Sequence, residues 1–525
     1  MRLWRHPDRF ASRQYRSLTV IMSSLWKVGG TCLLMMVLVW LVSIWRWQTT
    51  EVDVSGRDLV LQLVALPLML TAVLFAVLWM AQRIRVPDRC PVDRVDAPQP
   101  APASVVTDEL ERSCSVAVAE VAVMLSVGRD AGQAMSAVLA GMPRPSLAPL
   151  LQDMDGLPVF SARVEELDLA SAEHALPPHS SDQMRRAAAL LLPPLQQLLD
   201  RLGECLELTM PDRVSRVAQA VSSYQPDMKA HLAGIGAQRP AESGATRRQP
   251  GVVVRLAVPV NWPQAVRDHL LAWLRGQCHD KLGAFDLRLE VHLHPMEAGA
   301  ELWQLLDQQM KQWARQAASA HEACVLLVAD SAIDPEEVDR WQARGELFTA
   351  SHQSGRIPGE AAAGLLMLSA HWSGLTGELL PLARMYRPVC LSRDKSADAI
   401  GRVGHATLLA SLSQALQLAG GAPVQVEMVV SDGDHRASRT AEVFEALLAL
   451  NPELDPMLAI ARVGDLCGDL GLAGALVPTA LAASALARLS PDRIVLASQV
   501  QPSHHRAAIA LRAWLHEPEV ATPQV

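Results

Sequence analysis

The fold of this chain is decided by the stretch Ala323–Ser369, which reads ACVLLVADSAIDPEEVDRWQARGELFTASHQSGRIPGEAAAGLLMLS. It contains two short apolar runs, at 324–329 and 361–368, which are separated by an acidic turn-and-helix segment and a Pro-Gly turn. Apolar runs of this length between turn residues are typical of strands that are buried on both faces. Such strands belong to a sheet that helices cover on either side. The stretch therefore predicts a layered α/β core.

The chain on both sides of this stretch alternates between strand-like and helix-like segments, as an α/β protein does. The first strand is expected at 115–125, and the helix after it is expected at 131–139, with Asp130 as its N-cap and Gly141 at its end. A helix at 181–203 is expected to break at its two consecutive prolines. The other expected strands are 157–164, 252–260, 285–294, 424–430 and 493–498, and the other expected helices are 263–276, 301–318, 330–345, 400–418, 441–450 and 473–489.

Two apolar segments near the N-terminus are long enough to span a membrane. Residues 28–45 and 59–82 carry no charged side chain, and about 18 apolar residues cross the hydrocarbon core. Arginines precede the first segment and follow the second, and positively charged flanks stay in the cytoplasm. We therefore expect a transmembrane hairpin over residues 1–85, with spans at about 25–46 and 59–82 and with both chain ends in the cytoplasm.

Residues 86–109 are rich in proline and read as a linker.

The composition excludes several kinds of site. The 47 Lys and Arg against 55 Asp and Glu give a net charge of −8, which offers no sign of nucleic-acid binding. The eight cysteines have neither CxxC spacing nor a histidine spacing that suits zinc. We therefore predict no disulfide framework, no metal site and no cofactor.

Three phrases of the chain resemble the ketosynthase branch of the thiolase-like fold. GRIPGEAAAGLLML is similar to the family phrase GFxxGEGAGxLLL and has Gly359 and Glu360 at its centre. The strand, Gly-x-Asp turn and helix at 115–141 resemble the opening of a ketosynthase, and 468–489 resembles its GHxxGAAGA helix. The resemblance covers roughly residues 110–515. It implies a layered αβαβα body whose halves are 110–370 and 371–525.

The resemblance also implies where a catalytic centre would lie. A ketosynthase uses a cysteine at a helix start, where the helix N-terminus lowers the thiol pKa, together with two histidines. The segment before the helix at 301, HPMEAGA, contains no cysteine. His435 stands near the first histidine position in an altered phrase, and Asp469 replaces the second histidine. The nearest thiols, Cys278 and Cys324, are both out of place for a nucleophile.

A body that lacks the nucleophile is expected to bind a partner and not to catalyse a reaction. A membrane-tethered chain with such a body resembles the adaptor family found beside lipase effectors in bacterial type VI secretion clusters. The resemblance implies a protein of the bacterial inner membrane, anchored through residues 25–82. Its expected partners are a lipase-type effector and the secretion spike protein onto which the effector is loaded.

Other functions stay open from the sequence. The chain could be a divergent acyl-thioester condensing enzyme or acyltransferase of ketosynthase type, which would use Cys278 or Cys324 with His435. It could also be a plain membrane scaffold for the secretion apparatus. Ketosynthases often dimerise through a sheet edge, and the sequence does not decide whether this chain forms a homodimer.

Overall fold

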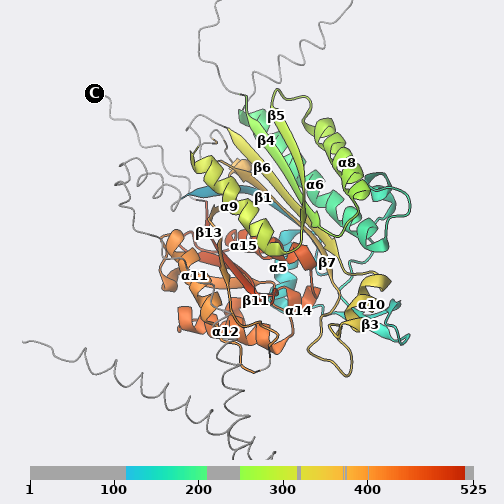
Figure 1. Cartoon of the computed structure of the whole chain (residues 1–525). Coiled ribbons are helices and arrows are strands. Elements are labelled where there is room, and N and C mark those ends of the chain that lie inside the picture. Colours follow the sequence, from blue (N-terminus) through green and yellow to red (C-terminus); the bar gives the residue numbers. More distant parts are fainter. Residues whose placement is uncertain are drawn as a thin grey trace, which may run out of the picture. The chain divides into compact units, whose positions relative to one another are not determined.

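The computed structural model describes residues 114–209, 249–315, 321–369, 372, 375, 377–399 and 401–514 (Figure 1). The expected hairpin over 1–85 and the linker over 86–109 lie outside these residues. Within the described ranges, no helix combines the length and the apolar character that a bilayer crossing needs. The described residues form a mixed α/β body, as the sequence predicts.

Eleven of the described strands form one mixed sheet. The bounds of its strands are β1 Ser115–Leu125, β4 Gly251–Pro259, β5 Arg288–Met296, β6 Glu322–Ser331, β7 Glu360–Leu368, β8 Ala383–Tyr386, β9 Val389–Ser392, β10 Val426–Ser431, β11 Ile460–Arg462, β12 Ile494–Gln499 and β13 His505–Ala513. Along the sheet they follow the order β11-β10-β12-β13-β8-β1-β7-β6-β4-β5, and β9 also pairs with β13.

The strand order is an internal duplication. Outward from the β1–β8 pair, the first half-sheet runs β1, β7, β6, β4, β5 and the second runs β8, β13, β12, β10, β11. If β9 is left aside, each half-sheet contains five strands. Strands at corresponding positions in the two half-sheets are also at the same place in the chain order of their half-sheet: first, fifth, fourth, second and third, counted outward from the β1–β8 pair. In each half-sheet the three outer strands are parallel, and the last strand in sequence, β7 or β13, is antiparallel to its neighbours. This duplication agrees with the two similar halves that the ketosynthase resemblance implies.

Helices separate and cover the two half-sheets. The bounds of the described helices are α5 Ala131–Ala140, α6 Asp182–Thr209, α8 Gln264–Leu282, α9 Gly299–Arg315, α10 Pro335–Ala343, α11 Ala406–Leu418, α12 Ala437–Leu450, α13 Pro456–Ala459, α14 Gly464–Cys467 and α15 Val477–Leu486, with short 3-10 turns η2 Ala170–Ala175, η3 Gly377–Leu379, η4 Pro423–Gln425 and η5 Gly471–Ala475.

The packing of these helices gives the body five layers. Helices α6 and α8 cover the outer face of the first half-sheet. Helices α5, α9 and α15 contribute to the central core, and α15 touches β1 and β7 on one side and β10, β12 and β13 on the other. Helices α11 and α12 cover the outer face of the second half-sheet (Figure 1). The order is therefore αβαβα.

The two predicted central strands are confirmed. Every residue of β6 and of β7 is buried, because these strands have sheet neighbours on both edges and helices on both faces. Gly364 in β7 shows how tightly α6 packs: a Cβ there would lie 2.5 Å from Cδ1 of Leu198. A small residue is needed wherever a helix approaches a strand this closely.

The predicted break in the helix at 181–203 is wrong. Helix α6 continues through Pro193 and Pro194 to Thr209. Each proline removes a backbone hydrogen bond from the helix. The apolar side chains of α6, among them Leu190, Leu198 and Leu202, are nevertheless fully buried against the sheet. Their burial outweighs the lost hydrogen bonds, since tertiary packing supplies most helix stability in proteins.

Several elements were not predicted or were misplaced. The proline-rich segment after α5 contains β2 Ser146–Gln152, which pairs with β3 Pro158–Ser161 in a separate two-stranded sheet. The helix predicted from residue 400 begins at Ala406. Strands β8, β9, β11 and β13 were also missed. Three of these four have only three or four residues, which is too short for a periodicity to show.

Candidate functional site

A cavity of about 990 Å³ opens at the start of α9. Its wall includes residues at the carboxyl ends of β4, β5, β6 and β12, together with the loops that follow them. The loop at 397–403 and the start of α12 complete the wall. Open α/β sheets commonly bind ligands beyond the carboxyl ends of their strands. The cavity is therefore the candidate site.

The start of α9 carries no nucleophile. Ala298 and Gly299 line the cavity where the ketosynthase resemblance implies a cysteine. A Cβ on Gly299 would lie 2.3 Å from Nε2 of Gln499, so only glycine fits there. The Gln499 amide is fixed because its Oε1 accepts a hydrogen bond from Nε1 of Trp303 at 3.0 Å. No cysteine is among the described residues that line the cavity, and His352 is the one histidine among them.

Asp330, at the carboxyl end of β6, is one of the buried carboxyl groups that line this cavity. Its Oδ2 accepts a hydrogen bond from the backbone N–H of Leu472 at 2.8 Å, and its Oδ1 accepts one from the N–H of Ser331 at 2.9 Å. Burial raises its pKa to about 7, against the opposing effect of these two donors. Asp330 is therefore partly protonated at neutral pH and can donate or accept a hydrogen bond.

Asp469, at the position of the second family histidine, forms an ion pair. Its Oδ2 lies 2.6 Å from Nε of Arg356, and its Oδ1 accepts a hydrogen bond from the N–H of Gly471 at 3.0 Å. Burial by itself raises the pKa of Asp469, but the Arg356 guanidinium outweighs this effect and holds the pKa at about 2. Asp469 therefore stays ionised and cannot transfer a proton near neutral pH.

His435, which the ketosynthase resemblance places near the first histidine position, packs against Phe348. It does not line the cavity. Its ring stacks edge-to-face on Phe348, with centroids 5.1 Å apart. Its Nε2 is buried and has no hydrogen-bond partner among the described residues. The next residue, Arg436, lines the cavity in its place.

The structure brings neither alternative nucleophile to the cavity. Cys278 lies in α8 and packs in the outer core, and Cys324 lies in β6 and packs in the central core. Burial raises the pKa of each thiol to about 12. No contact of either thiol with His435 is found in the described part of the chain. The structure therefore does not bring Cys278 or Cys324 together with His435 at the cavity.

Gly359 and Glu360 lie beside the cavity and support its wall. A Cβ on Gly359 would lie 2.0 Å from the carbonyl oxygen of Cys467, so the two backbones approach too closely for another residue. Glu360 is fully buried and pairs with Arg186 of α6 through two hydrogen bonds, of which Nε to Oε2 measures 2.7 Å. It also accepts a hydrogen bond from Oγ of Ser331 at 2.9 Å. Both residues thus have a structural role at the start of β7.

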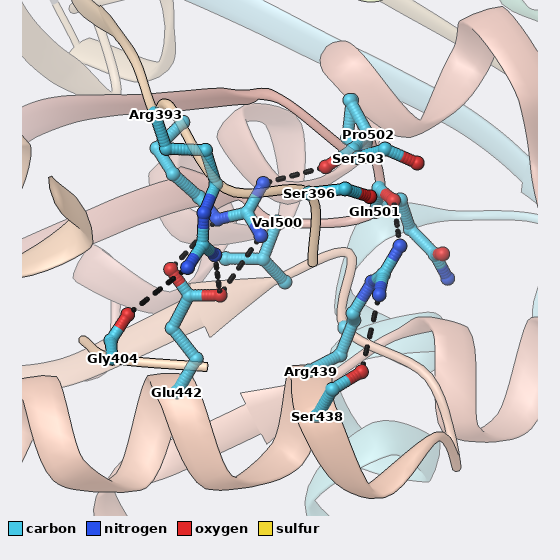
Figure 2. Close-up of polar contacts among 12 residues, drawn as sticks. Arg393, Ser396, Gly404, Ser438, Arg439, Glu442, Val500, Gln501, Pro502 and Ser503 are labelled. Atoms are coloured by element: carbon cyan, nitrogen blue, oxygen red, sulfur yellow. Dashed lines mark hydrogen bonds and ion pairs between the residues drawn. The ribbon is translucent and has the colours of Figure 1, made fainter. Parts of the chain in front are cut away.

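The arginines of the cavity were not found from the sequence. Arg439 of α12 donates to both carboxylate oxygens of Asp398, at 2.5 and 2.9 Å. It also donates to Oγ of Ser438 at 3.1 Å and to the carbonyl oxygen of Gln501 at 3.0 Å (Figure 2). Arg436 lies 3.5 Å from Asp398 and 2.7 Å from Asp434. Nothing in the sequence around Asp398 signals this contact, because Asp398 lies in a loop far from α12 along the chain.

A second group of charges anchors the loop that carries Asp398. Figure 2 shows Arg393 facing Glu442 of α12, with a hydrogen bond of 2.9 Å, and reaching the carbonyl oxygen of Gly404 at 3.3 Å. Arg506 of β13 pairs with the same Glu442 at 2.8 Å, and both of these side chains are fully buried. Arg393 therefore ties the two ends of the loop to each other and to α12, while Asp398 lies between them.

No group of three side chains that could hold a metal ion occurs in the part of the chain that the structure describes. The described loops around the cavity also contain none of the glycine-rich motifs that bind the phosphates of nucleotides. The arrangement suits a binding cavity with paired charges and one partly protonated carboxyl group.

No protein-family model matches this chain, and no curated protein matches it. Among solved structures, it is similar to the ishigamide ketosynthase/chain length factor at 17% identity, over 76% of this chain and 99% of that one, with a TM-score of 0.46. It is similar to AntDE:AntF, a type II PKS acyl-carrier protein in complex with its ketosynthase, at 12% identity over 77% and 100%, with a TM-score of 0.48. It is also similar to the ketosynthase from module 1 of the bacillaene synthase from Bacillus amyloliquefaciens FZB42, at 12% identity over 78% and 77%, with a TM-score of 0.44.

Proposed function

We propose that the described body is a thiolase-like binding module that performs no thiol chemistry. The observation that carries this proposal is the start of α9, where Ala298 and Gly299 line the cavity and no thiol does. The five layers and the duplicated strand order support the thiolase-like assignment.

The state of the described thiols supports the same proposal. A nucleophilic cysteine is accessible and has a lowered pKa, because the thiolate is the reactive form. Cys278, Cys324 and Cys467 are fully buried, and burial raises the pKa of each to about 12. Asp469 cannot replace the missing imidazole, because its ion pair with Arg356 keeps it charged.

A thiol-labelling experiment tests this proposal. Ala298→Cys places a thiol at the start of α9, where the helix dipole favours the thiolate. Under native conditions we expect iodoacetamide to alkylate residue 298 in the variant and to leave Cys278, Cys324 and Cys467 unmodified in both proteins. Peptide mass spectrometry after digestion reads out each site. Rapid native alkylation of Cys278 or Cys324 would contradict the proposal.

We propose further that the module acts as an adaptor at the bacterial inner membrane. In this role it binds a lipase-type effector and helps to load the effector on the type VI secretion spike. Support for this finer role comes from the expected N-terminal hairpin over 1–85 and from a body without a nucleophile.

Co-purification tests the adaptor role. The full-length chain, solubilised from its own host in a mild detergent, is expected to retain a lipase-type effector and, through it, the spike protein. The double variant Cys278→Ala/Cys324→Ala is a control, and it should retain the lipase equally well. Recovery of the spike protein without any lipase would favour a plain membrane scaffold.

The competing function is a divergent condensing enzyme or acyltransferase, which the shared layered architecture favours. It requires a covalent acyl-cysteine intermediate. Incubation of the full-length chain with acetyl and malonyl thioesters, followed by intact-mass measurement, separates the two functions. A binding module shows no acyl adduct, whereas an adduct that disappears in a Cys278→Ala or Cys324→Ala variant would establish the enzyme.

A further inference from the structure

We propose that the cavity binds a small organic carboxylate on Arg436 and Arg439, at a position that the chain's own Asp398 carboxylate occupies in this structure. The proposal does not depend on the adaptor role. It assigns a ligand class to a cavity whose ketosynthase chemistry is absent.

The two arginines form a built anion site. Arg439 is fully buried and Arg436 is 9% exposed, and both line the cavity of about 990 Å³. They lie at the start of α12, which has no side-chain cap, and helix N-termini favour negative charge. The Nε of Arg439 is buried without a hydrogen-bond partner among the described residues. This N–H group is therefore a donor that still needs an acceptor oxygen.

Asp398 shows which chemical group the site accepts. Its two oxygens receive two parallel hydrogen bonds from Arg439, at 2.5 and 2.9 Å. Oγ of Ser503 donates a third hydrogen bond at 2.5 Å. Burial by itself raises the pKa of Asp398, but the hydrogen bonds from Arg439 and Ser503 outweigh this effect and lower the pKa to about 2. A two-pronged contact of this kind fits a planar carboxylate.

Asp398 is also the component of the site that can leave. Its side chain is 45% exposed, whereas that of Arg439 is 1% exposed. It lies in a loop that Arg393 ties both to Glu442 and to the carbonyl oxygen of Gly404, and the N–H of Ala397 donates to the carbonyl oxygen of Ser503 at 2.8 Å. Breaking the Asp398 contact therefore does not require the loop to detach.

When Asp398 moves away, the arginines of the site have too little negative charge beside them. Asp434 stays on Arg436 at 2.7 Å, and the charge of Asp469 also acts on Arg436, whereas Arg439 loses the carboxylate that it pairs with. Arg402 needs no further negative charge, because its side chain is 78% exposed and pairs with Glu445. A buried charge without a partner is costly, and an incoming carboxylate removes that cost. The same space beyond the arginines, toward Asp330 and Gln499, holds the rest of the ligand.

The test compares full-length wild type in detergent with the Asp398→Asn variant. Succinate is titrated against each protein, with sodium chloride at matched ionic strength as the blank and inorganic phosphate as a second anion. The rise in melting temperature gives the half-saturation concentration. In the wild type the Asp398 carboxylate competes with succinate for the arginines at a local concentration of about a millimolar or more. Because Asp398→Asn removes this competing charge, we expect it to lower the succinate half-saturation concentration about tenfold.

Matched variants make the result specific. Adding Arg436→Gln to Asp398→Asn should abolish the succinate effect, whereas adding Arg402→Gln, which changes an arginine of the same cavity wall, should leave it intact. If Asp398→Asn does not fold, Ser503→Ala weakens the same contact without changing a charge and should lower the half-saturation concentration a few-fold. Equal half-saturation in wild type and both single variants would overturn the proposal. A phosphate effect that exceeds the succinate effect would overturn the carboxylate assignment.

Discussion

Nε of Arg356 lies 2.6 Å from Oδ2 of Asp469, and the same guanidinium stacks 3.9 Å from the ring centre of Trp341. The position at which the ketosynthase resemblance implies a proton-transferring imidazole thus holds one half of a charge pair. Because the pair bridges the loop before β7 and the loop after α14, it joins two walls of the cavity. The role of Asp469 in this structure is therefore to hold these two walls together.

Asp469→Asn should destabilise the protein by about 2 kcal/mol at pH 7. Removal of one partner from a buried pair costs about 3–5 kcal/mol, and the partial exposure of Arg356, 29%, reduces that cost. The folded pKa of Asp469, about 2, is below its unfolded value. Its contribution is therefore complete above about pH 4 and is lost as the pH falls toward 2. Urea unfolding of wild type and variant at pH 7 and pH 3 measures both effects, and an equal difference at the two pH values would contradict them.

Asp330 should make the protein less stable as the pH rises from 4 to 8. Its folded pKa of about 7 is above the unfolded value, because burial penalises the ionised form. The unfolded state therefore loses its proton first, and the free energy of unfolding falls by about 1 kcal/mol per pH unit between the two pKa values. Asp330→Asn should reduce this slope. Buried Asp432, with a similar pKa of about 7, contributes a slope that the variant keeps.

Glu360→Gln should cost about 3–5 kcal/mol, because it leaves the buried guanidinium of Arg186 without a counter-charge. The surface pair of Lys281 and Asp200 provides a matched control, since both of its side chains are about half exposed. Asp200→Asn should change the free energy of unfolding by less than about 1 kcal/mol. Similar losses for the two variants would show that the Glu360 pair is not as buried as the structure has it.

Gly359→Ala should destabilise the body strongly, whereas Gly276→Ala should not. A Cβ at residue 359 would lie 2.0 Å from a backbone oxygen, and backbone cannot move aside as a flexible side chain can. Gly276 lies within α8 with nothing within 4 Å of its added Cβ, so alanine there should stabilise by up to about 1 kcal/mol. Melting temperatures of the two variants measure the difference in stability, and Gly359→Ala should melt at the lower temperature.

Much of the fold could be predicted because its long buried strands are mostly apolar. The strand at 115–125 and the helix start at Asp130 are as predicted, since Asp130 accepts a hydrogen bond from the N–H of Gln133 and Gly141 adopts a positive φ of 70°. The proline pair of α6 misled the prediction, because the packing that overrides it is not visible in local sequence. Strands β8, β9 and β11 were missed because they have only three or four residues, and β2, the partner of the predicted strand at 157–164, was missed because it lies in a proline-containing segment.

The candidate site was predictable only where a motif marked it. The absence of cysteine before α9 and the substitution at Asp469 follow from the aligned phrases, and the structure places Ala298, Gly299 and Asp469 around one cavity. Asp330 and Gln499 end buried strands, a signal that the sequence contained but that no motif singled out. The contact between Asp398 and Arg439 joins a loop to a helix, and only the folded chain brings them together.

The pairing of β1 has a consequence for synthesis of the protein. Ala117 pairs with Leu368 and Ser115 with Tyr386, so both neighbours of β1 are made long after it. At about 5–20 residues per second, the ribosome needs on the order of 10–50 seconds to deliver them. During that interval an apolar strand waits without hydrogen-bonding partners, and such unpaired edges aggregate. We therefore expect chaperones that shield the nascent chain to raise the yield of folded protein.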